Sequence, residues 1–311
     1  MSAYRELSAA DLDALCRLAG ARSVISCRPI TAGIENSNWF VDLDVDGHPQ
    51  ASVLTLVESV PADELPFFIT LADTLAVADL PVPVPRLLAG GRRQFMLQGR
   101  PAILVPRLPG DHADVPTHAQ CEAAGTMLAR LHAAAARCPL VRERPDHRWW
   151  PTAFAYVAPG LARVDHDELA AALLDASRVF AHAHALPHGT IHGDFFRDNV
   201  LLAGDEVSGV LDFFHATRDL LAWDMAIALN DWAVVGGVPD ASRAEAFLAG
   251  HARVRPLRRE EEDLLPALRR AAAARFWLSR LVAAEKQSAF GNGAIQRKDP
   301  GDMRALLRAL S

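Results

Sequence analysis

The chain contains almost no lysine. Lys286 and Lys298 are the only two lysines among 311 residues, and both lie near the C-terminus. Neither is preceded by the glycines or followed by the Ser or Thr of a P-loop, G-x-x-x-x-G-K-[ST]. The composition therefore excludes a Walker-type nucleotide site. The sequence also lacks the G-x-S-x-G elbow of α/β-hydrolases and the H-E-x-x-H motif of zinc proteases.

Long apolar runs, basic blocks and paired cysteines are missing as well. No uncharged apolar run reaches the roughly 18 residues of a transmembrane helix, and the first residues do not have the pattern of a signal peptide. A net charge of −6 without a Lys/Arg cluster argues against nucleic-acid binding. The four cysteines, Cys16, Cys27, Cys121 and Cys138, form no C-x-x-C pair. We expect a cytoplasmic protein with reduced thiols and a small-molecule substrate. The sequence leaves the oligomeric state open.

The composition that remains is typical of a soluble globular protein. Half of the residues are hydrophobic and 23% are charged, which suffices for a large core. The length exceeds the roughly 100–150 residues of a typical domain. We therefore expect either two lobes or one large domain.

Residues 191–214 contain four polar residues with informative spacing: His192, Asp194, Asn199 and Asp212. Two short apolar runs lie between Asn199 and Asp212, around a Gly/Asp turn, which predicts a β-hairpin. Pairing centred between residues 205 and 206 would place Asn199 opposite Asp212, on strands about 4.8 Å apart. Their oxygen atoms would then suit Mg²⁺.

This spacing also matches the H-x-D-x4-N pattern and the later metal-binding Asp of kinases. In that interpretation Asp194 is catalytic, because it accepts or orients the proton of a substrate hydroxyl. Asn199 and Asp212 hold Mg²⁺ on the nucleotide phosphates, and His192 braces the loop. The alternative is an ordinary hairpin with polar ends.

The N-terminal third predicts a small antiparallel sheet. A helix is expected over residues 9–19 with Ser8 as N-cap, and strands over 39–45 and 51–57 flank the turn Asp46-Gly47. The loop before the first of these strands contains Gly33, Asn36 and Ser37, whose backbone amides are candidates for binding nucleotide phosphates. A plain turn is the alternative.

A helix over residues 66–80 and a strand over 102–105 complete this region. The strand leads into residues 105–107, where the backbone of Val105 and Arg107 is expected to pair with adenine. ATP would lie between this lobe and the next. Beyond the N-terminal lobe, the apolar periodicity predicts helices, and residues 139–160 are predicted to form a loop. The predicted helices cover residues 117–135, 167–184, 220–232, 241–252 and 260–284, the last with a possible interruption at Pro266.

Charged residues in two of these apolar helices are candidates for substrate binding. Asp231 is a candidate for a substrate ammonium, Arg275 and Arg280 for a carboxylate, and Trp232 for a wall of the pocket. Structural ion pairs would explain the two arginines equally well. For Asp231, the equal alternative is a carboxylate at a helix end beside solvent. Asp224, buried in the same helix, is expected to accept amide groups of the catalytic loop.

The chain resembles the aminoglycoside-phosphotransferase-like kinases, and within them the homoserine-kinase branch. The resemblance implies an α+β, two-lobed protein-kinase-like fold, with a nucleotide-binding N-lobe over 1–105 and a catalytic C-lobe over 106–311. It also implies phosphorylation of L-homoserine with ATP and Mg²⁺, in threonine biosynthesis. The matching stretches are GIENSNWFV (33–41), VLTLVE (53–58), LPFFI (65–69), LPVPVP (80–85), IHGDFFRDNVL (191–201), GVLDFFHA (209–216), WDMAIALNDWA (223–233) and RFWLSRLVAAE (275–285).

One departure concerns the N-lobe lysine that grips the nucleotide phosphates in related kinases. Thr55 stands at that position. Arg197, as a further catalytic residue, and the backbone N–H groups of the loop are candidates to replace this cation. The first interpretation of Arg197 is nevertheless a brace in the catalytic loop. Kinases for choline, ethanolamine, methylthioribose or aminoglycosides are the rival enzymes. A catalytically weak nucleotide-binding regulatory protein is the rival outside catalysis.

Overall fold

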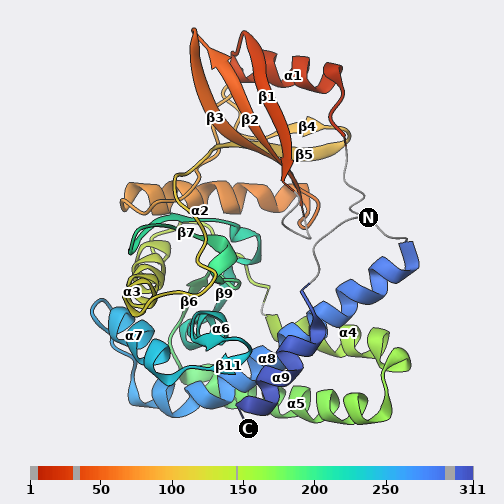
Figure 1. Ribbon diagram of the computed structural model, residues 1–311, viewed down its shortest axis with the longest axis vertical. Helices are drawn as coiled ribbons and strands as arrows, with labels where there is room; N and C mark the ends of the chain where they lie inside the picture. Colours follow the sequence, from red (N-terminus) through yellow and green to blue (C-terminus); the bar gives the residue numbers. More distant parts are fainter. Residues whose placement is uncertain (1–5, 31–35, 145, 291–297, 311) are drawn as a thin grey trace. The chain divides into compact units, whose positions relative to one another are not determined.

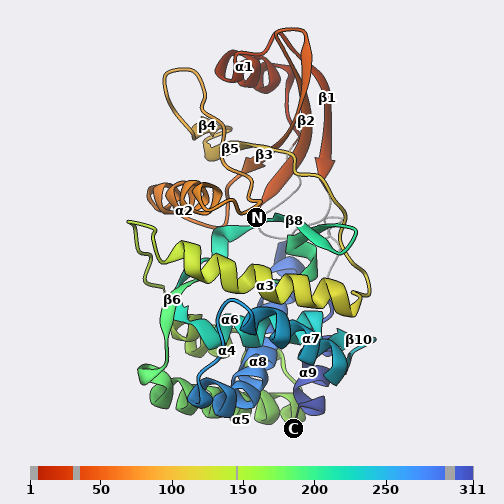
Figure 2. The same cartoon turned by 90° about the vertical axis from the view of Figure 1, so that its left-hand side faces the viewer.

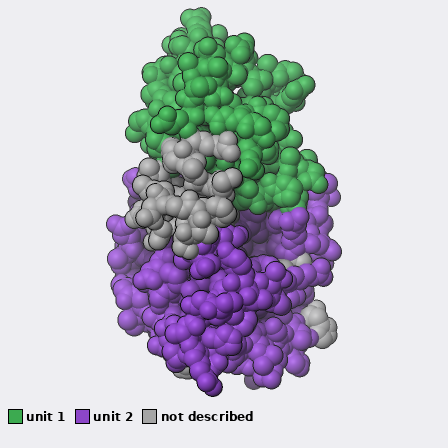
Figure 3. Space-filling model, turned by 90° about the vertical axis from the view of Figure 1, so that its right-hand side faces the viewer, with its two compact units in different colours: residues 1–108, 291–297 green, residues 109–290, 298–311 purple. Residues whose placement is uncertain are grey.

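The chain divides into two units after Leu108. In the computed structural model, residues 6–30, 36–144, 146–290 and 298–310 are described. One unit is Met1–Leu108 with Gly291–Arg297, and the other is Pro109–Phe290 with Lys298–Ser311 (Figure 3). Within the described residues, no helix combines the length and apolar character that a membrane crossing requires.

The first unit is built on a five-stranded antiparallel sheet in the order β1-β2-β3-β5-β4 (Figure 1). Alternation along β2 points Trp39, Val41 and Leu43 into a core that also contains Leu54 of β3 and Leu15 of α1. The elements are α1 (Ala9–Ala19), β1 (Ser23–Ile30), β2 (Ser37–Val45), β3 (His48–Leu56), α2 (Leu65–Val77), β4 (Phe95–Leu97) and β5 (Arg100–Pro106).

Local signals in this unit are confirmed. Ser8 caps α1 in a reciprocal capping box with Asp11. Asp46 and Gly47 both have positive φ, 51° and 82°, as the two-residue turn between β2 and β3 requires. Strand β1 was not predicted, because its exposed residues show no alternation of apolar and polar side chains.

The second unit is mainly helical (Figure 2). The long helix α8 packs against α4, α5, α6 and α9, while α3 packs against α7. Gly125 and Gly250 allow that approach, because a Cβ on either would overlap a backbone carbonyl of the other helix. The helices are α3 (His118–Ala135), α4 (Trp150–Val157), α5 (Arg163–His182), α6 (Leu221–Trp232), α7 (Ala241–Ala252), α8 (Arg259–Phe290) and α9 (Pro300–Ala309).

Two predictions in this unit need correction. Residues 139–160 are not all loop, because α4 begins at Trp150, with Pro151 in its first turn. Proline is tolerated there, since the first helical N–H groups have no intrahelical partner. Pro266 does not interrupt α8: proline removes a single backbone donor, and the helix is held along its length by its packing.

Short antiparallel pairs position the loops of this unit. β6 (His188–Ile191) pairs with β9 (Thr217–Leu220), and β7 (Val200–Ala203) pairs with β8 (Glu206–Val210). β10 (Val234–Val235) pairs with β11 (Val238–Pro239). Residues 192–199 therefore run from the end of β6 to the start of β7, fixed at both ends.

Candidate active site

Asp224 anchors the loop that follows β6. Its carboxylate accepts the backbone amides of His192 and Gly193, both at 2.8 Å, and the Nε2–H of His132 at 2.8 Å. Burial alone would raise the pKa of Asp224, but the hydrogen bonds from the His132 ring and from the backbone amide of His192 outweigh it and lower that pKa. Gly193 has φ +79° and a Cβ there would meet the His215 carbonyl, so the turn requires glycine. The predicted role of Asp224 is confirmed.

His192 connects this loop to the strand end before Asp212. Its Nδ1 accepts the amide of Asp194 at 3.2 Å, and its Nε2 lies 2.9 Å from the Leu211 carbonyl. These partners assign the proton to Nε2. Burial, the largest influence, lowers the pKa of His192, so the imidazole stays neutral while it braces the loop. The predicted role of His192 is also confirmed.

Asn199 contacts Asp194 directly. Its Nδ2 donates to the backbone carbonyl and to Oδ2 of Asp194, both at 2.9 Å. The backbone carbonyl of Asn199 accepts the Leu211 amide at 2.8 Å. The amide oxygen of Asn199 therefore points away from Asp194.

The predicted register of the β7–β8 hairpin is off by one residue. The turn is centred on Gly204-Asp205, and an extra residue in β8 shifts the ladder between Leu201 and Leu202. Asn199 consequently lies opposite Leu211, and Asp212 follows directly after that pair. Asp212 adopts φ +55°, which turns its backbone sharply out of the strand direction.

The donors around this point suit a hard cation. Asn199 has an amide oxygen, and Asp212 has an exposed carboxylate. Oδ1 of Asp212 accepts a long hydrogen bond, 3.4 Å, from the Phe214 amide. Oxygen donors of this kind are those that Mg²⁺ takes. The assignment of both residues to a metal stays a prediction that fits their chemistry.

Arg197 and Asp231 form an ion pair with several hydrogen bonds. Both Nε and Nη2 of Arg197 donate to the Asp231 carboxylate, and so does the Arg197 backbone amide, while Nη1 donates to the Asp114 carbonyl. The structure therefore favours the brace over the substitute cation for Arg197. Asp231 accepts three hydrogen bonds from Arg197, and its role for a substrate ammonium stays a prediction.

The other predicted substrate residues are Trp232, Arg275 and Arg280, and two of them are buried. Trp232 is fully buried and donates to the Phe195 carbonyl at 3.1 Å, which corrects its expected place at a pocket wall. Arg275 is also buried, with its guanidinium 4.0 Å from the ring centroid of Phe276. Arg280 is partly buried, and its Nη1 donates to the Asp299 carbonyl at 2.7 Å.

Sequence reasoning missed a second charged pair on the catalytic loop. The Lys298 ammonium lies 2.5 Å from the Asp198 carboxylate and 5.0 Å from the ring centroid of Phe196. The signal that could have pointed to it is the scarcity of lysine itself, since Lys298 is one of only two.

The predicted nucleotide residues of the first unit are placed as follows. Gly33 lies outside the described residues. The side chain of Asn36 accepts the amides of Glu58 and Ser59 at 2.8 and 3.1 Å, and Ser37 is buried at the start of β2. Both side chains thus serve the fold, and any phosphate contact of this loop would come from its backbone.

The backbone amide of Arg107, one candidate for the adenine contact, is engaged within the sheet. Its amide donates to the Ala51 carbonyl at 3.2 Å, so it continues the β3–β5 ladder and is not free for a ligand. Its guanidinium lies 4.3 Å from the ring centroid of Phe40. Val105 pairs with Val53, and by alternation it shares a sheet face with Phe40 and Thr55.

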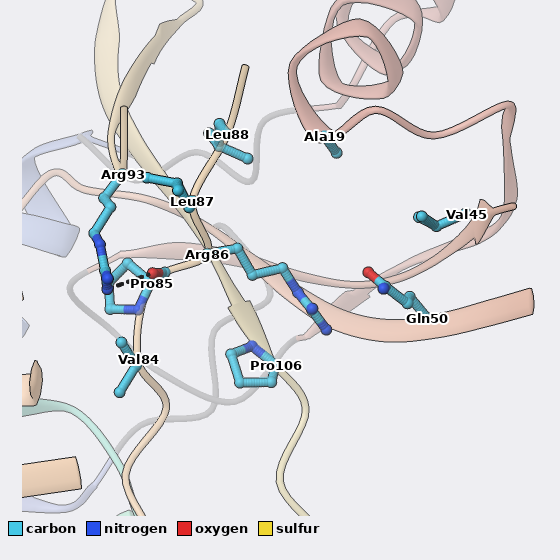
Figure 4. Close-up of a pocket in the computed structure, with 10 residues that line it drawn as sticks. All are labelled: Ala19, Val45, Gln50, Val84, Pro85, Arg86, Leu87, Leu88, Arg93 and Pro106. Atoms are coloured by element: carbon cyan, nitrogen blue, oxygen red, sulfur yellow. Dashed lines mark hydrogen bonds between the residues drawn. The ribbon is translucent and has the colours of Figure 1, made fainter. Parts of the chain in front are cut away.

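A pocket of about 460 Å³ lies elsewhere in the first unit. Figure 4 shows Arg86 extending between Gln50 and Pro106 on one side, and Arg93 turned to the Pro85 carbonyl on the other. Pro106 belongs to the sheet face opposite to Val105, because neighbouring residues of a strand alternate. None of the predicted nucleotide residues that the structure describes lines this pocket.

The fold and the loop define a protein-kinase-like phosphotransferase. Solved structures share the fold at low identity: amicoumacin kinase hAmiN, in complex with AMP-PNP, Ca²⁺ and Ami, has a TM-score of 0.73 at 13% identity over 96% of this chain and 90% of that one. The microcompartment-associated aminopropanol kinase has a TM-score of 0.69 at 18% identity over 96% and 93%. The predicted α+β, kinase-like fold is confirmed.

The chain belongs to the phosphotransferase enzyme family, whose model matches residues 26–257. It is similar to a homoserine kinase of Pseudomonas aeruginosa (strain LESB58), 39% identical over 99% of this chain and 96% of that protein. A homoserine kinase of Neisseria meningitidis serogroup B is 38% identical over 100% of both chains. The resemblance to the homoserine-kinase branch, inferred from the sequence motifs, is confirmed.

Proposed function

We propose that this chain is an ATP- and Mg²⁺-dependent kinase that phosphorylates the hydroxyl of L-homoserine, a step of threonine biosynthesis. The observation that carries the proposal is the hydrogen bond from Asn199 to the Asp194 carboxylate. Asp212 follows directly after Leu211, whose amide donates to the Asn199 carbonyl. Full-length similarity to proteins named homoserine kinase supports the choice of acceptor.

The residues of the loop divide the chemistry between them. The Asp194 carboxylate accepts or orients the proton of the attacking hydroxyl. Asn199 and Asp212 hold Mg²⁺, which neutralises charge on the transferred phosphoryl group when it is bound. His192 and Asp224 keep the loop in position, because phosphoryl transfer depends mostly on positioning and electrostatics.

The nucleotide is expected to bind to residues of the first unit. Val105 shares a sheet face with Val53 and Phe40, and these apolar side chains suit an adenine ring. Thr55, on the same face, has no charge to offer a phosphate. Gly33, Asn36 and Ser37 would contribute backbone amides.

A choline kinase, the rival whose substrate would need a cage of aromatic side chains, is a weaker alternative. A quaternary ammonium needs an open aromatic cage, whereas Trp150, Trp223 and Trp232 are buried. Trp150 and Trp223 pack on each other, with ring centroids 6.1 Å apart. The other alcohol kinases and the regulatory protein are rivals that an activity panel separates.

The test is ADP formation by the purified chain with ATP, Mg²⁺ and a panel of alcohols. The panel contains L-homoserine, choline, ethanolamine, methylthioribose and an aminoglycoside. We expect turnover with L-homoserine to exceed that with every other acceptor. Turnover on another member, or ATP binding without turnover on any, would contradict the proposed function.

A further inference from the structure

Arg197 and Asp231, the charged pair that joins the catalytic loop to α6, are already hydrogen-bonded to each other. L-homoserine carries an ammonium and a carboxylate close to its hydroxyl, and a specific site must match both. A second group of charges lies beside the catalytic loop: Asp198, Lys298 and Arg280. We propose that these three residues bind the amino-acid end of the acceptor, Asp198 its ammonium and Lys298 with Arg280 its carboxylate. The inference rests on the proposed function and names the residues that select its substrate.

The ion pair between Asp198 and Lys298 can exchange partners. Their charged atoms are 2.5 Å apart, and their side chains are 53% and 42% exposed. A pair this exposed contributes little to stability, so opening it costs little. An incoming zwitterion offers each side chain a new partner of opposite charge, and the number of ion pairs rises by one.

The pair is also close to the reacting group. Asp198 lies in the 3-10 turn Arg197–Asn199, directly before the residue whose Nδ2 donates to the Asp194 carboxylate. The Lys298 ammonium lies over the ring of Phe196, which is itself buried and in contact with Phe276 at 4.6 Å between centroids. Phe196 thus fixes the ammonium beside the loop that holds Asp194.

Arg280 supplies the second cation from α8. Its side chain is 11% exposed, and Nη1 donates to the Asp299 carbonyl at 2.7 Å and to Asp302 at 3.4 Å. This contact also anchors the backbone next to Lys298. Among the described residues, the hydrogen bonds of Arg280 all leave from Nη1, and a substrate carboxylate would pair with Nε and Nη2.

The electrostatics of Arg280 agree with this placement. Burial lowers the pKa of Arg280, while Asp302, Asp231, Asp198 and Asp194 raise it. The guanidinium therefore lies in the field of the loop carboxylates. A substrate carboxylate near Arg280 and Lys298 would meet two cations, which reduces the repulsion from those acidic residues.

Acceptor analogues test each half of the site separately. Aminopropanol lacks the carboxylate of homoserine, and γ-hydroxybutyrate lacks the ammonium. The variants are Lys298→Met and Asp198→Asn, with Lys286→Met as a matched control, since Lys286 is the other lysine and lies exposed on α8. For each variant, kcat and KM are measured with all three acceptors and with ATP, and L-homoserine binding is measured by calorimetry.

We expect Lys298→Met to lower kcat/KM for L-homoserine about tenfold to a hundredfold, as the loss of a charged hydrogen bond would. Its kcat/KM for aminopropanol and its KM for ATP should stay within about twofold of the wild type. Asp198→Asn should impair L-homoserine and aminopropanol alike and spare γ-hydroxybutyrate. Lys286→Met should match the wild type throughout.

Equal losses on L-homoserine and aminopropanol in Lys298→Met, or a rise confined to the KM for ATP, would overturn the assignment. A rise confined to the KM for ATP would mean that Lys298 contacts the nucleotide phosphates. Wild-type turnover of L-homoserine with unaffected variants would overturn the site and leave the proposed function standing. Binding of L-homoserine that needs Lys298 and Asp198 without phosphorylation would support the site and contradict the proposed function. A wild type that neither binds nor phosphorylates L-homoserine would overturn both.

Discussion

Arg197 and Asp231 are joined by hydrogen bonds from both the side chain and the backbone of the arginine. The Arg197 amide lies 2.7 Å from the Asp231 carboxylate, and Nε lies 2.9 Å from it. This relationship holds the catalytic loop against α6 at a point three residues after Asp194. A loop that must place Asp194 on a hydroxyl gains its geometry from such contacts.

Removing this brace is expected to lower turnover more than substrate binding. Arg197→Ala should decrease kcat while the KM for L-homoserine changes less, because the loop is displaced and no substrate contact is lost. The free energy of unfolding should fall by about 2 kcal/mol, between the values for exposed and buried ion pairs. Steady-state kinetics and urea unfolding measure both effects.

A double-mutant cycle separates the brace from a direct catalytic role. If Arg197 acts through Asp231, the double variant Arg197→Ala with Asp231→Ala should be little worse than either single variant in kcat. Fully additive losses in kcat would instead show that Arg197 contacts the transferred phosphoryl group.

Asp224 should be the most sensitive carboxylate for stability. Asp224→Ala leaves the buried amides of His192 and Gly193 and the ring of His132 without their acceptor. We expect a loss of about 3 kcal/mol in the free energy of unfolding. Urea unfolding of this variant is compared with Asp175→Ala, in which an exposed helical ion pair is removed. Similar losses in the two variants would contradict the anchoring role.

The metal assignment predicts a change in the Mg²⁺ requirement. Asp212→Asn should raise the Mg²⁺ concentration for half-maximal activity by at least about tenfold, since a charged oxygen ligand is replaced by a neutral one. EDTA should abolish turnover of the wild type, and added Mg²⁺ should restore it. A Mg²⁺ titration of Asp212→Asn that overlays the wild type would exclude this residue as a ligand.

The stability of the second unit should depend on pH through His251. Burial, followed by the nearby His132 and Arg255, lowers the pKa of His251 to about 3, against about 6.5 in the unfolded chain. Between these values the unfolded state binds more protons, so the free energy of unfolding falls as pH drops below about 6.5. The slope for this one group approaches 1.4 kcal/mol per pH unit.

His251→Leu should remove that part of the slope. Its loss of stability between about pH 7 and pH 5 should be smaller than the wild-type loss by about 2 kcal/mol. His48→Gln, at an exposed position on β3, serves as the control and should keep the wild-type loss. An unchanged pH dependence in His251→Leu would mean that other groups carry the acid sensitivity.

Local signals explain what the sequence could predict. The capping box at Ser8 and the turn at Asp46-Gly47 each depend on neighbouring residues, and both are found as expected. The role of Asp224 was also predictable, because a carboxylate in an apolar helix needs donors, and the catalytic loop was the region richest in candidates.

The rest of the site depends on contacts distant in sequence. The pairing of Asp198 with Lys298 joins residues a hundred positions apart, and no periodicity encodes it. The register of the β7–β8 hairpin changed through one extra residue near its turn, which the apolar pattern alone does not locate. The same pattern could not tell that Trp232 faces the core, since α6 is buried on nearly every side.

The central claim is that Asp194 acts on the hydroxyl of L-homoserine. The most direct test is the rate of ADP formation with L-homoserine, ATP and Mg²⁺, compared between the wild type and Asp194→Asn. We predict turnover by the wild type and a loss of at least about a thousandfold in kcat for the variant, with ATP binding retained. Near-normal turnover by Asp194→Asn would contradict the account.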